Sequence, residues 1–280
     1  MKIRLAALAA TALIVAAWSC TKLPSDPGTP FSIAFRRAPS PSVVLGDVMR
    51  DSTGQPAKLQ AFAFNLRGDT IRDFPVTYFL VAKDSQPGKL EDGLITAYSD
   101  TAYIGDTLRV VAVAGGVQST PLRIVVTVKP DALVLVGTDT VRFLLPATTD
   151  SLPLSASMSV RLRHTPIAPE PTRDTVVPAY EVRYRVVGSS SGVSDSSYVT
   201  IADGSRRFAP IDTTDANGGV SRQLRVRRTK YPYPYDTITP GTSAVDTVYV
   251  DATASYMGTA VAGSPVRFKV LVTLAKPPTS

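Results

Sequence analysis

The chain has little of the chemistry that most catalytic and metal sites require. It contains one cysteine, Cys20, and one histidine, His164, and glutamate is rare. A single cysteine excludes an internal disulfide, and one histidine cannot complete a zinc site. A serine triad would need His164 to be held by a buried carboxylate, and we expect no serine to lie in a nucleophile-elbow context such as G-x-S-x-G. The sequence therefore predicts no enzyme, no cofactor and no metal site.

Hydrophobic runs long enough to cross a membrane are also missing. The longest apolar stretch runs from Leu5 to Ala17, interrupted only by Thr11, and follows the cations Lys2 and Arg4. A membrane-spanning helix needs about 20 apolar residues. A short apolar run after a positive start is typical of a secretory signal. We expect residues 1–19 to be a signal peptide and the rest to have no transmembrane helix.

Cys20 stands directly after this signal. The segment Ala17-Trp18-Ser19-Cys20 resembles the lipobox at which bacterial lipoproteins are cleaved and acylated. The resemblance implies lipidation of Cys20, and Thr21, in place of an aspartate, favours the outer membrane. The alternative is a plain signal peptide with an unrelated cysteine. A free thiol is a liability in an oxidising compartment, so acylation explains Cys20 better.

The charge balance is mildly basic. The chain has 30 Lys+Arg and 23 Asp+Glu, and removal of residues 1–19 takes Lys2 and Arg4 away, which leaves 28 against 23. This excess is too dilute to predict nucleic-acid binding. We expect the membrane as a partner through the lipid, with an envelope polysaccharide or another envelope protein as further candidates. Residues 20–30 are rich in proline and predict an extended tether, about 30 Å long at ~3.1 Å per residue.

The remaining sequence is a succession of strand patterns. Runs of Val, Thr, Tyr and Ala alternate with polar residues and are separated by Gly, Pro, Asp and Ser clusters. In 247–254, for example, Val248, Val250, Ala252 and Ala254 share one face. Proline and β-branched residues disfavour helices throughout. The pattern predicts an all-β protein whose sheets have one buried face.

The chain also repeats itself. Residues 106–114 (DTLRVVAVA) are echoed by 246–254 (DTVYVDATA), and 119–124 by 263–268. The offset is 140 positions in the first match and 144 in the second, so the second connecting loop is four residues longer. Each copy ends in a strand and a Lys-Pro pair. We therefore predict domains at 31–129 and 130–276, followed by a tail at 277–280.

Several of these segments resemble bacterial immunoglobulin-like repeats of intimin- and invasin-type adhesins. The resemblance rests on Leu59–Ala63, Arg67–Ile71 and Phe74–Phe79 in the first copy and on Thr214–Val220 in the second. It implies two tandem immunoglobulin-like β-sandwich domains, and it concerns the fold far more than any activity. The second copy is longer than such sandwiches usually are, about 100 residues. The excess lies in two Pro-rich insertions, His164–Pro178 and Thr229–Ala244.

The most suggestive surface feature is the sequence RQLRVRRTKYPYPY at 222–235. Cations beside exposed rings could hold a glycan or another polyanion. The residues of this candidate site are Arg225, Arg227, Arg228, Lys230, Tyr231, Tyr233 and Tyr235. The alternative is that the arginines solubilise a sheet face and the tyrosines pack over the end of the sandwich. Clustering of both insertions at one ordered tip would favour binding.

Three other motifs have simpler interpretations. We expect His164 to be an exposed loop residue. Asp212–Gly218 resembles a cation loop but lacks a suitable glutamate, so a tight turn is favoured over calcium. Arg67-Gly68-Asp69 coincides with an expected strand turn and is not taken as an integrin motif.

The sequence as a whole predicts a non-enzymatic, lipid-anchored envelope protein whose domains act as a spacer and interaction module, with adhesion or glycan binding as its use. The alternative is a structural accessory subunit of a larger envelope assembly.

Overall fold

The computed structural model describes residues 26–81, 86–145, 153–166, 176–192 and 198–276. The expected signal peptide, Cys20, most of the tether and the tail 277–280 lie outside the described residues. Within the described part, helical structure is confined to three short 3-10 turns: η1 (Thr101–Tyr103), η2 (Arg228–Lys230) and η3 (Tyr235–Thr237). None of its helices is long and apolar enough to cross a membrane. The all-β prediction is confirmed.

The strands from Ser32 to Thr127 form the first unit. One sheet has the order β1-β3-β4 and the other β2-β10-β8-β5, with β9 beside β8 and a separate hairpin β6-β7. The bounds are β1 (Ser32–Phe35), β2 (Ser42–Val44), β3 (Ala61–Phe64), β4 (Thr70–Ile71), β5 (Thr77–Leu80), β6 (Gly88–Glu91), β7 (Leu94–Ala97), β8 (Thr107–Ala114), β9 (Val117–Gln118) and β10 (Leu122–Thr127).

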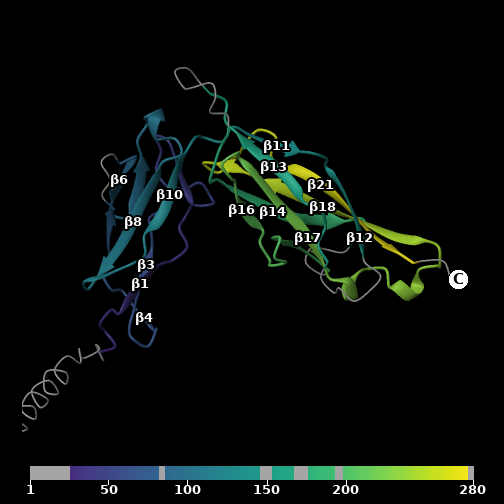
Figure 1. Cartoon of the computed structure of the whole chain (residues 1–280), viewed down its shortest axis with the longest axis horizontal. Helices are drawn as coiled ribbons and strands as arrows, with labels where there is room; N and C mark the ends of the chain where they lie inside the picture. Colours follow the sequence, from purple (N-terminus) through teal and green to yellow (C-terminus); the bar gives the residue numbers. More distant parts are fainter. Residues whose placement is uncertain (1–25, 82–85, 146–152, 167–175, 193–197, 277–280) are drawn as a thin grey trace, which may run out of the picture.

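The strands from Ala132 to Ala275 form the second unit, which lies beside the first (Figure 1). Its sheets have the orders β11-β13-β17-β15 and β12-β21-β18-β14-β16, and β19-β20 is a small hairpin. The bounds are β11 (Ala132–Val136), β12 (Thr140–Leu145), β13 (Met158–Arg163), β14 (Glu181–Ser189), β15 (Val199–Ala202), β16 (Ile211–Thr213), β17 (Gly219–Val226), β18 (Ser243–Thr253), β19 (Ser255–Tyr256), β20 (Thr259–Ala260) and β21 (Val266–Ala275).

The two units share a strand arrangement that the sequence repeat explains. In the first, β8 pairs antiparallel with β10, and β10 pairs parallel with the edge strand β2. In the second, β18 pairs antiparallel with β21, and β21 pairs parallel with the edge strand β12. The matched sequences 106–114 and 246–254 therefore supply the same strand of each sheet. The expected junction at Lys129-Pro130 falls between β10 and β11.

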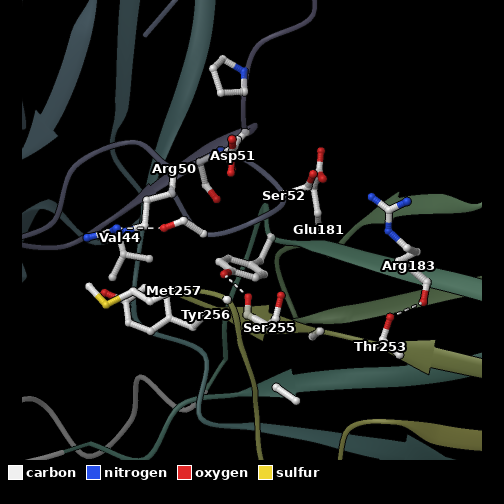
Figure 2. Close-up of a pocket in the computed structure, with 18 of the residues that line it drawn as sticks. Val44, Arg50, Asp51, Ser52, Glu181, Arg183, Thr253, Ser255, Tyr256 and Met257 are labelled. Atoms are coloured by element: carbon white, nitrogen blue, oxygen red, sulfur yellow. Dashed lines mark hydrogen bonds between the residues drawn. The ribbon is translucent and has the colours of Figure 1, made fainter. Parts of the chain in front are cut away.

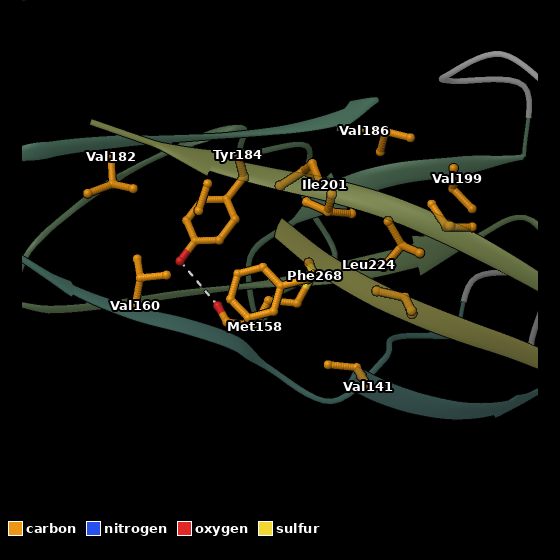
Figure 3. Close-up of a cluster of buried hydrophobic side chains, with 14 of the residues drawn as sticks. Val141, Met158, Val160, Val182, Tyr184, Val186, Val199, Ile201, Leu224 and Phe268 are labelled. Carbon is orange, nitrogen blue, oxygen red and sulfur yellow. Dashed lines mark hydrogen bonds between the residues drawn. The ribbon is translucent and has the colours of Figure 1, made fainter. Parts of the chain in front are cut away.

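Each unit buries its own apolar residues. In the second unit, Tyr184 lies at the centre of the sandwich near Phe268, and its hydroxyl donates to the carbonyls of Met158 and Val220 at 3.1 and 3.2 Å (Figure 3). The partners matter because a buried hydroxyl without them would cost about 1–3 kcal/mol. The four residues expected to share a face, three on β18 and Ala254 just after its end, are all buried, as predicted. The first unit has two smaller clusters, around Ile95 and around Ala112.

The expectation of an exposed His164 is wrong. The residue is only 7% exposed, because β13 carries it to the segment that connects the units. Its Nδ1 lies 2.9 Å from the carbonyl oxygen of Lys129 and 2.9 Å from a carboxylate oxygen of Asp131. The single histidine is therefore part of the connection between the units.

Candidate functional site

The longer loop of the second repeat contacts the first unit. The four extra residues extend it into the hairpin β19-β20, whose turn at Met257-Gly258 meets the turn Asp51–Gly54 of the first unit. A β-carbon on Gly54 would lie 2.2 Å from the Gly258 nitrogen, a separation that real side chains do not show. The hairpin and Gly54 thus form one half of a joint between the units.

Asp47 of the first unit forms the other half of the joint, as the hydrogen-bond acceptor for the hairpin. Its carboxylate receives a two-pronged hydrogen bond from Arg50 at 2.8 and 2.9 Å, and the hydroxyl of Tyr256 donates to it at 2.9 Å. Arg50 also donates to the carbonyl of Gly54 at 2.9 Å. Burial raises the pKa of Asp47, but hydrogen bonds from Arg50, Val48 and Tyr256 outweigh it and hold the pKa below its ordinary value of 3.8. Asp47 is therefore a charged anchor for the Tyr256 hydroxyl.

Further contacts support the joint at its sides. The Tyr180 hydroxyl donates to the carbonyl of Ser255 at 2.7 Å, which holds the hairpin against the second unit. Burial raises the pKa of Tyr180 to about 12, so this phenol remains a donor at neutral pH. Arg37 of the first unit forms a salt bridge with Glu181 of the second at 2.9 Å. Arg37 is largely exposed, so this pair adds little on its own.

A cleft of about 290 Å³ lies between the units beside these contacts (Figure 2). Its size is at the lower limit of small-molecule pockets. Ser42 lines it, and the Ser42 hydroxyl is buried without a hydrogen-bond partner among the described residues. Arg183 and Thr253 border the cleft on the side of the second unit. Since Arg50 and Tyr256 both donate to Asp47, these side chains serve the contact between the units.

The predicted basic and aromatic segment lies at the end of the second unit that is remote from the first unit, near the C-terminus (Figure 1). The loop that follows it is held to the end of the last strand, since Gly241 donates to the carbonyl of Lys276 and Lys276 to that of Thr242. Arg225 is not part of this end. Its side chain lies on the face of the sheet and donates to Thr200 and to the carbonyl of Arg206.

The aromatic residues of this segment have different environments. The binding interpretation requires three displayed rings, whereas the alternative has the tyrosines packed over the end of the sandwich. Tyr231 follows the alternative, since it is 6% exposed and packs in the core. The Tyr231 hydroxyl donates to the carbonyl of Val272 at 2.7 Å. Tyr233 is exposed and meets the Tyr231 ring edge-on. The centre of the Tyr235 ring lies 5.5 Å from the guanidinium carbon of Arg228 and 5.4 Å from the ammonium nitrogen of Lys276.

Arg227, Lys230 and Tyr233 therefore remain as the exposed members of the predicted site. Lys276 lies over the Tyr235 ring and so belongs to the same surface. The sequence analysis missed this cation because it follows the last strand, far from residues 222–235. The described ends of the first insertion, residues 164–166 and 176–178, do not lie at the remote end. Thr165, in the first insertion, donates to Asp131 near the joint, whereas the second insertion lies at the remote end.

A buried aspartate with a hydrogen-bond network was also missed. Asp246 is fully buried, and its carboxylate accepts hydrogen bonds from the hydroxyls of Ser190, Ser191 and Tyr198 and from the Ser191 amide. Burial raises its pKa, but the bonds from Tyr198 and the serines hold the pKa below 3.8. The only feature of the sequence that pointed to Asp246 was the Asp-Thr pair at the start of both matched segments, 106–114 and 246–254.

The segment Gly188–Gly192 fits the string G-x-S-x-G, contrary to our expectation that no serine has this context. It lies at the end of β14, and the next described element is the strand β15, so the strand-to-helix setting of a nucleophile elbow is not found among the described residues. The Ser190 hydroxyl donates to Asp246, whereas His164 follows β13 and contacts Lys129 and Asp131 at the connection between the units. The arrangement is that of a structural carboxylate.

The turns have their expected form. Asp215 accepts hydrogen bonds from the amides of Asn217 and Gly219, so its carboxylate serves the turn. Gly68 lies in the turn between β3 and β4 with φ of +84°. Among the described residues, no cluster of three or more potential ligands could hold a metal ion.

Comparisons with known proteins give distant likenesses. No protein-family model matches the chain, and no curated protein matches it. Among solved structures, the adhesin InvE of Yersinia pseudotuberculosis is 15% identical with a TM-score of 0.35, and the match covers 86% of this chain and 58% of the adhesin. The cadherin-like domains 1 to 4 of zebrafish RET are 13% identical with a TM-score of 0.33, over 91% of this chain and 49% of theirs.

A third likeness is to domains 5–6 of the S-layer protein SbsC, at 10% identity and a TM-score of 0.26, over 90% of this chain and 99% of that one. This chain thus spans about half the length of the first two structures. At such identities and scores the likenesses carry no functional argument, and the strand orders and registers above describe the fold.

Proposed function

We propose that this chain is an exported, non-enzymatic protein that is anchored to the outer membrane through a lipid on Cys20. Its two units would act as a stiff spacer that holds the remote end of the second unit at a fixed position relative to the anchor. The remote end would be the part that meets an envelope polysaccharide or another envelope protein.

The joint between the units is the observation that carries this proposal. A flexible linker would leave the units free, whereas here Tyr256 bonds to Asp47 and the backbones at Gly54 and Gly258 are in close contact. Domain interfaces within a chain are mobile unless they are well packed. The hairpin β19-β20 is added to the second repeat and packs against the first unit. Such an addition is expected where the angle between the two units has to be fixed.

The remote end supports the interaction role. Arg227 and Lys230 are exposed there beside the exposed ring of Tyr233. Exposed cations and aromatic rings are frequent among residues that dominate interfaces. The fixed backbone between Thr242 and Lys276 would present them without a large loss of entropy on binding.

One observation favours the second candidate, an accessory subunit of a larger assembly. Val44 stands beside Thr127 on the edge strand β2, lines the cleft and is 8% exposed. Leu144 takes the corresponding place beside Thr273 on β12 and is 64% exposed. The edge-strand position is buried at Val44 in the first unit and exposed at Leu144 in the second. An exposed leucine on an edge strand would suit contact with a partner protein.

Metabolic labelling with a fatty-acid analogue tests the anchor. We expect the wild-type chain to be labelled and to fractionate with the outer membrane, and Cys20→Ser to lose the label and enter the soluble fraction. Thr21→Ser serves as a matched control and should behave as wild type. Equal membrane association of Cys20→Ser and wild type would refute anchoring through Cys20.

Leu144→Glu separates the two candidates. If the chain is an accessory subunit, this substitution should abolish chemical crosslinks between the chain and its envelope neighbours in intact cells. If the chain is a spacer with a recognising end, the crosslinks should persist and should instead be lost on Arg227→Gln with Lys230→Gln.

A further inference from the structure

The outward face of the five-stranded sheet in the second unit carries cations from three strands. Each of these cations alternates along its strand with buried or partly buried residues, so all of their side chains point away from the core. All five are exposed. They are Arg142 on β12, Arg183 and Arg185 on β14, and Arg267 and Lys269 on β21. We call this set the basic face.

The strand register brings these side chains together. On β18, which separates β14 from β21, Asp251 stands directly between Arg185 and Arg267. Tyr249 lies beside Lys269 in the next outward row. Adjacent strands are about 4.8 Å apart and outward residues on one strand about 7 Å apart. The cations therefore form a compact group and are not scattered over the surface.

The acids on this face are already used. Asp251 is bound by both prongs of Arg267, at 2.7 and 2.9 Å. Glu181 forms its salt bridge with Arg37. Among the described residues, no salt bridge is found for Arg142, Arg183, Arg185 or Lys269. A surplus of like charge on one face costs stability through repulsion unless an anion reduces it.

We propose that the basic face binds an acidic polysaccharide through the carboxylates of its sugar units. The Arg267–Asp251 pair demonstrates on this same face how a guanidinium takes up a carboxylate in a planar, two-pronged arrangement. Arg183 and Arg185 offer the same group to a ligand. Between the cations, the half-buried Tyr249 and Leu271 provide apolar surface for sugar rings.

An extended polymer fits this face better than a small anion does. The cations follow three strands across the sheet, so no single small ligand would reach all of them. Arg183 also borders the cleft between the units, which gives the polymer a continuous path from the sheet to the joint. This binding goes beyond the spacer function and does not depend on acylation of Cys20 or on stiffness of the joint.

The test is affinity electrophoresis of the full-length protein, in mild detergent, through gels that contain polygalacturonate or neutral dextran. We expect retardation by polygalacturonate and none by dextran. Retardation should fall steeply between about 50 mM and about 200 mM salt, since it depends on release of counterions. No retardation by polygalacturonate, or equal retardation by dextran, would overturn the proposal.

A matched pair of variants locates the site. Arg142→Gln, Arg185→Gln and Lys269→Gln together should weaken binding about tenfold, from three exposed charge contacts. Arg36→Gln, Arg67→Gln and Arg72→Gln remove the same charge from exposed positions of the first unit and should change binding by no more than about twofold. Equal weakening by both triple variants would show a net-charge effect and refute the basic face.

Vesicles that contain an anionic phospholipid give the last comparison. If the protein binds such vesicles and fails to bind polygalacturonate, the polysaccharide assignment is wrong. Both triple variants should unfold at the same temperature as the wild-type protein. Lost binding then reflects lost contacts with the polysaccharide and not a loss of folding. Should the first triple variant be unfolded, Arg185→Glu alone must still weaken polygalacturonate binding.

Discussion

The Tyr256 hydroxyl donates a 2.9 Å hydrogen bond to the Asp47 carboxylate, across 209 positions of sequence and between the two units. Removal of this hydroxyl should weaken the joint and leave each core intact. A hydrogen bond to a charged group contributes about 1.5–3 kcal/mol. Tyr256→Phe should therefore lower the free energy of unfolding by about 1–2 kcal/mol in urea titrations.

Tyr249→Phe is the matched control for that substitution. Tyr249 is also half-buried on a strand of the second unit, and its hydroxyl makes no hydrogen bond to another described residue. We expect its loss to change the free energy of unfolding by less than about 0.5 kcal/mol. Equal effects of the two substitutions would mean that the Tyr256–Asp47 bond contributes nothing specific.

Acid should loosen the joint. The pKa of Asp47 is lowered in the folded protein, so the folded state favours the ionised carboxylate. Its contribution is complete above the ordinary pKa of 3.8 and is lost as the pH falls through the lowered value. Scanning calorimetry from pH 5 downward should show a drop in Tm below about pH 4.

Asp246 and Asp131 also have lowered pKa values and contribute to the same acid loss. The share of Asp47 is isolated by Asp47→Asn, which should be less stable than wild type at pH 7 and should lose less Tm on acidification. An acid response of Asp47→Asn identical to that of wild type would rule out Asp47 as a contributor.

Gly54 has to be glycine because of the backbone it faces. Gly54→Ala would place a carbon 2.2 Å from the Gly258 nitrogen, and it would also strain a φ of +85°. Gly68→Ala imposes the same strain at φ +84° with nothing within 4 Å. Strain alone costs about 1 kcal/mol, so urea unfolding should show a clearly larger loss for Gly54→Ala. Indistinguishable losses would contradict the close contact.

Asp246 should be among the most sensitive positions of the second unit. Asp246→Ala leaves the buried hydroxyl of Tyr198, and the less buried hydroxyls of Ser190 and Ser191, without their acceptor. A buried donor left without a partner costs about 1–3 kcal/mol, so the loss of stability should be at least about 2 kcal/mol. Asp236→Ala, at an exposed position, should cost less than about 0.5 kcal/mol. Chemical denaturation of the two variants compares them, and a small loss at Asp246 would refute its structural role.

Sequence patterns predicted the strands well where one face is buried and the other is wet. The alternation of Val248, Val250 and Ala252 gave the orientation of β18 directly, and the repeat matched the strand pairing in both sheets. These features are local, or depend on the two-residue period of a strand. The same holds for the turn at Gly68.

The joint and the remote end were beyond such reasoning. The repeat revealed that one loop was longer, but not that Tyr256 would meet Asp47. Tyr231 belongs to a Tyr-Pro run that looks exposed, yet its ring lies under Tyr233 and in the core. His164 follows a predicted strand and stands two residues before Pro166, which suggested a loop. In each case the partner lies far away in the sequence, where local patterns carry no information.

The stiffness of the joint is tested most directly by a distance distribution between the units. With Cys20→Ser, spin labels at Arg72→Cys and Ser221→Cys place one probe on an exposed position of each unit. Pulsed electron paramagnetic resonance should give one narrow peak, which broadens when Tyr256→Phe and Asp47→Ala are added. A broad distribution in the parent protein, unchanged by these substitutions, would contradict the spacer.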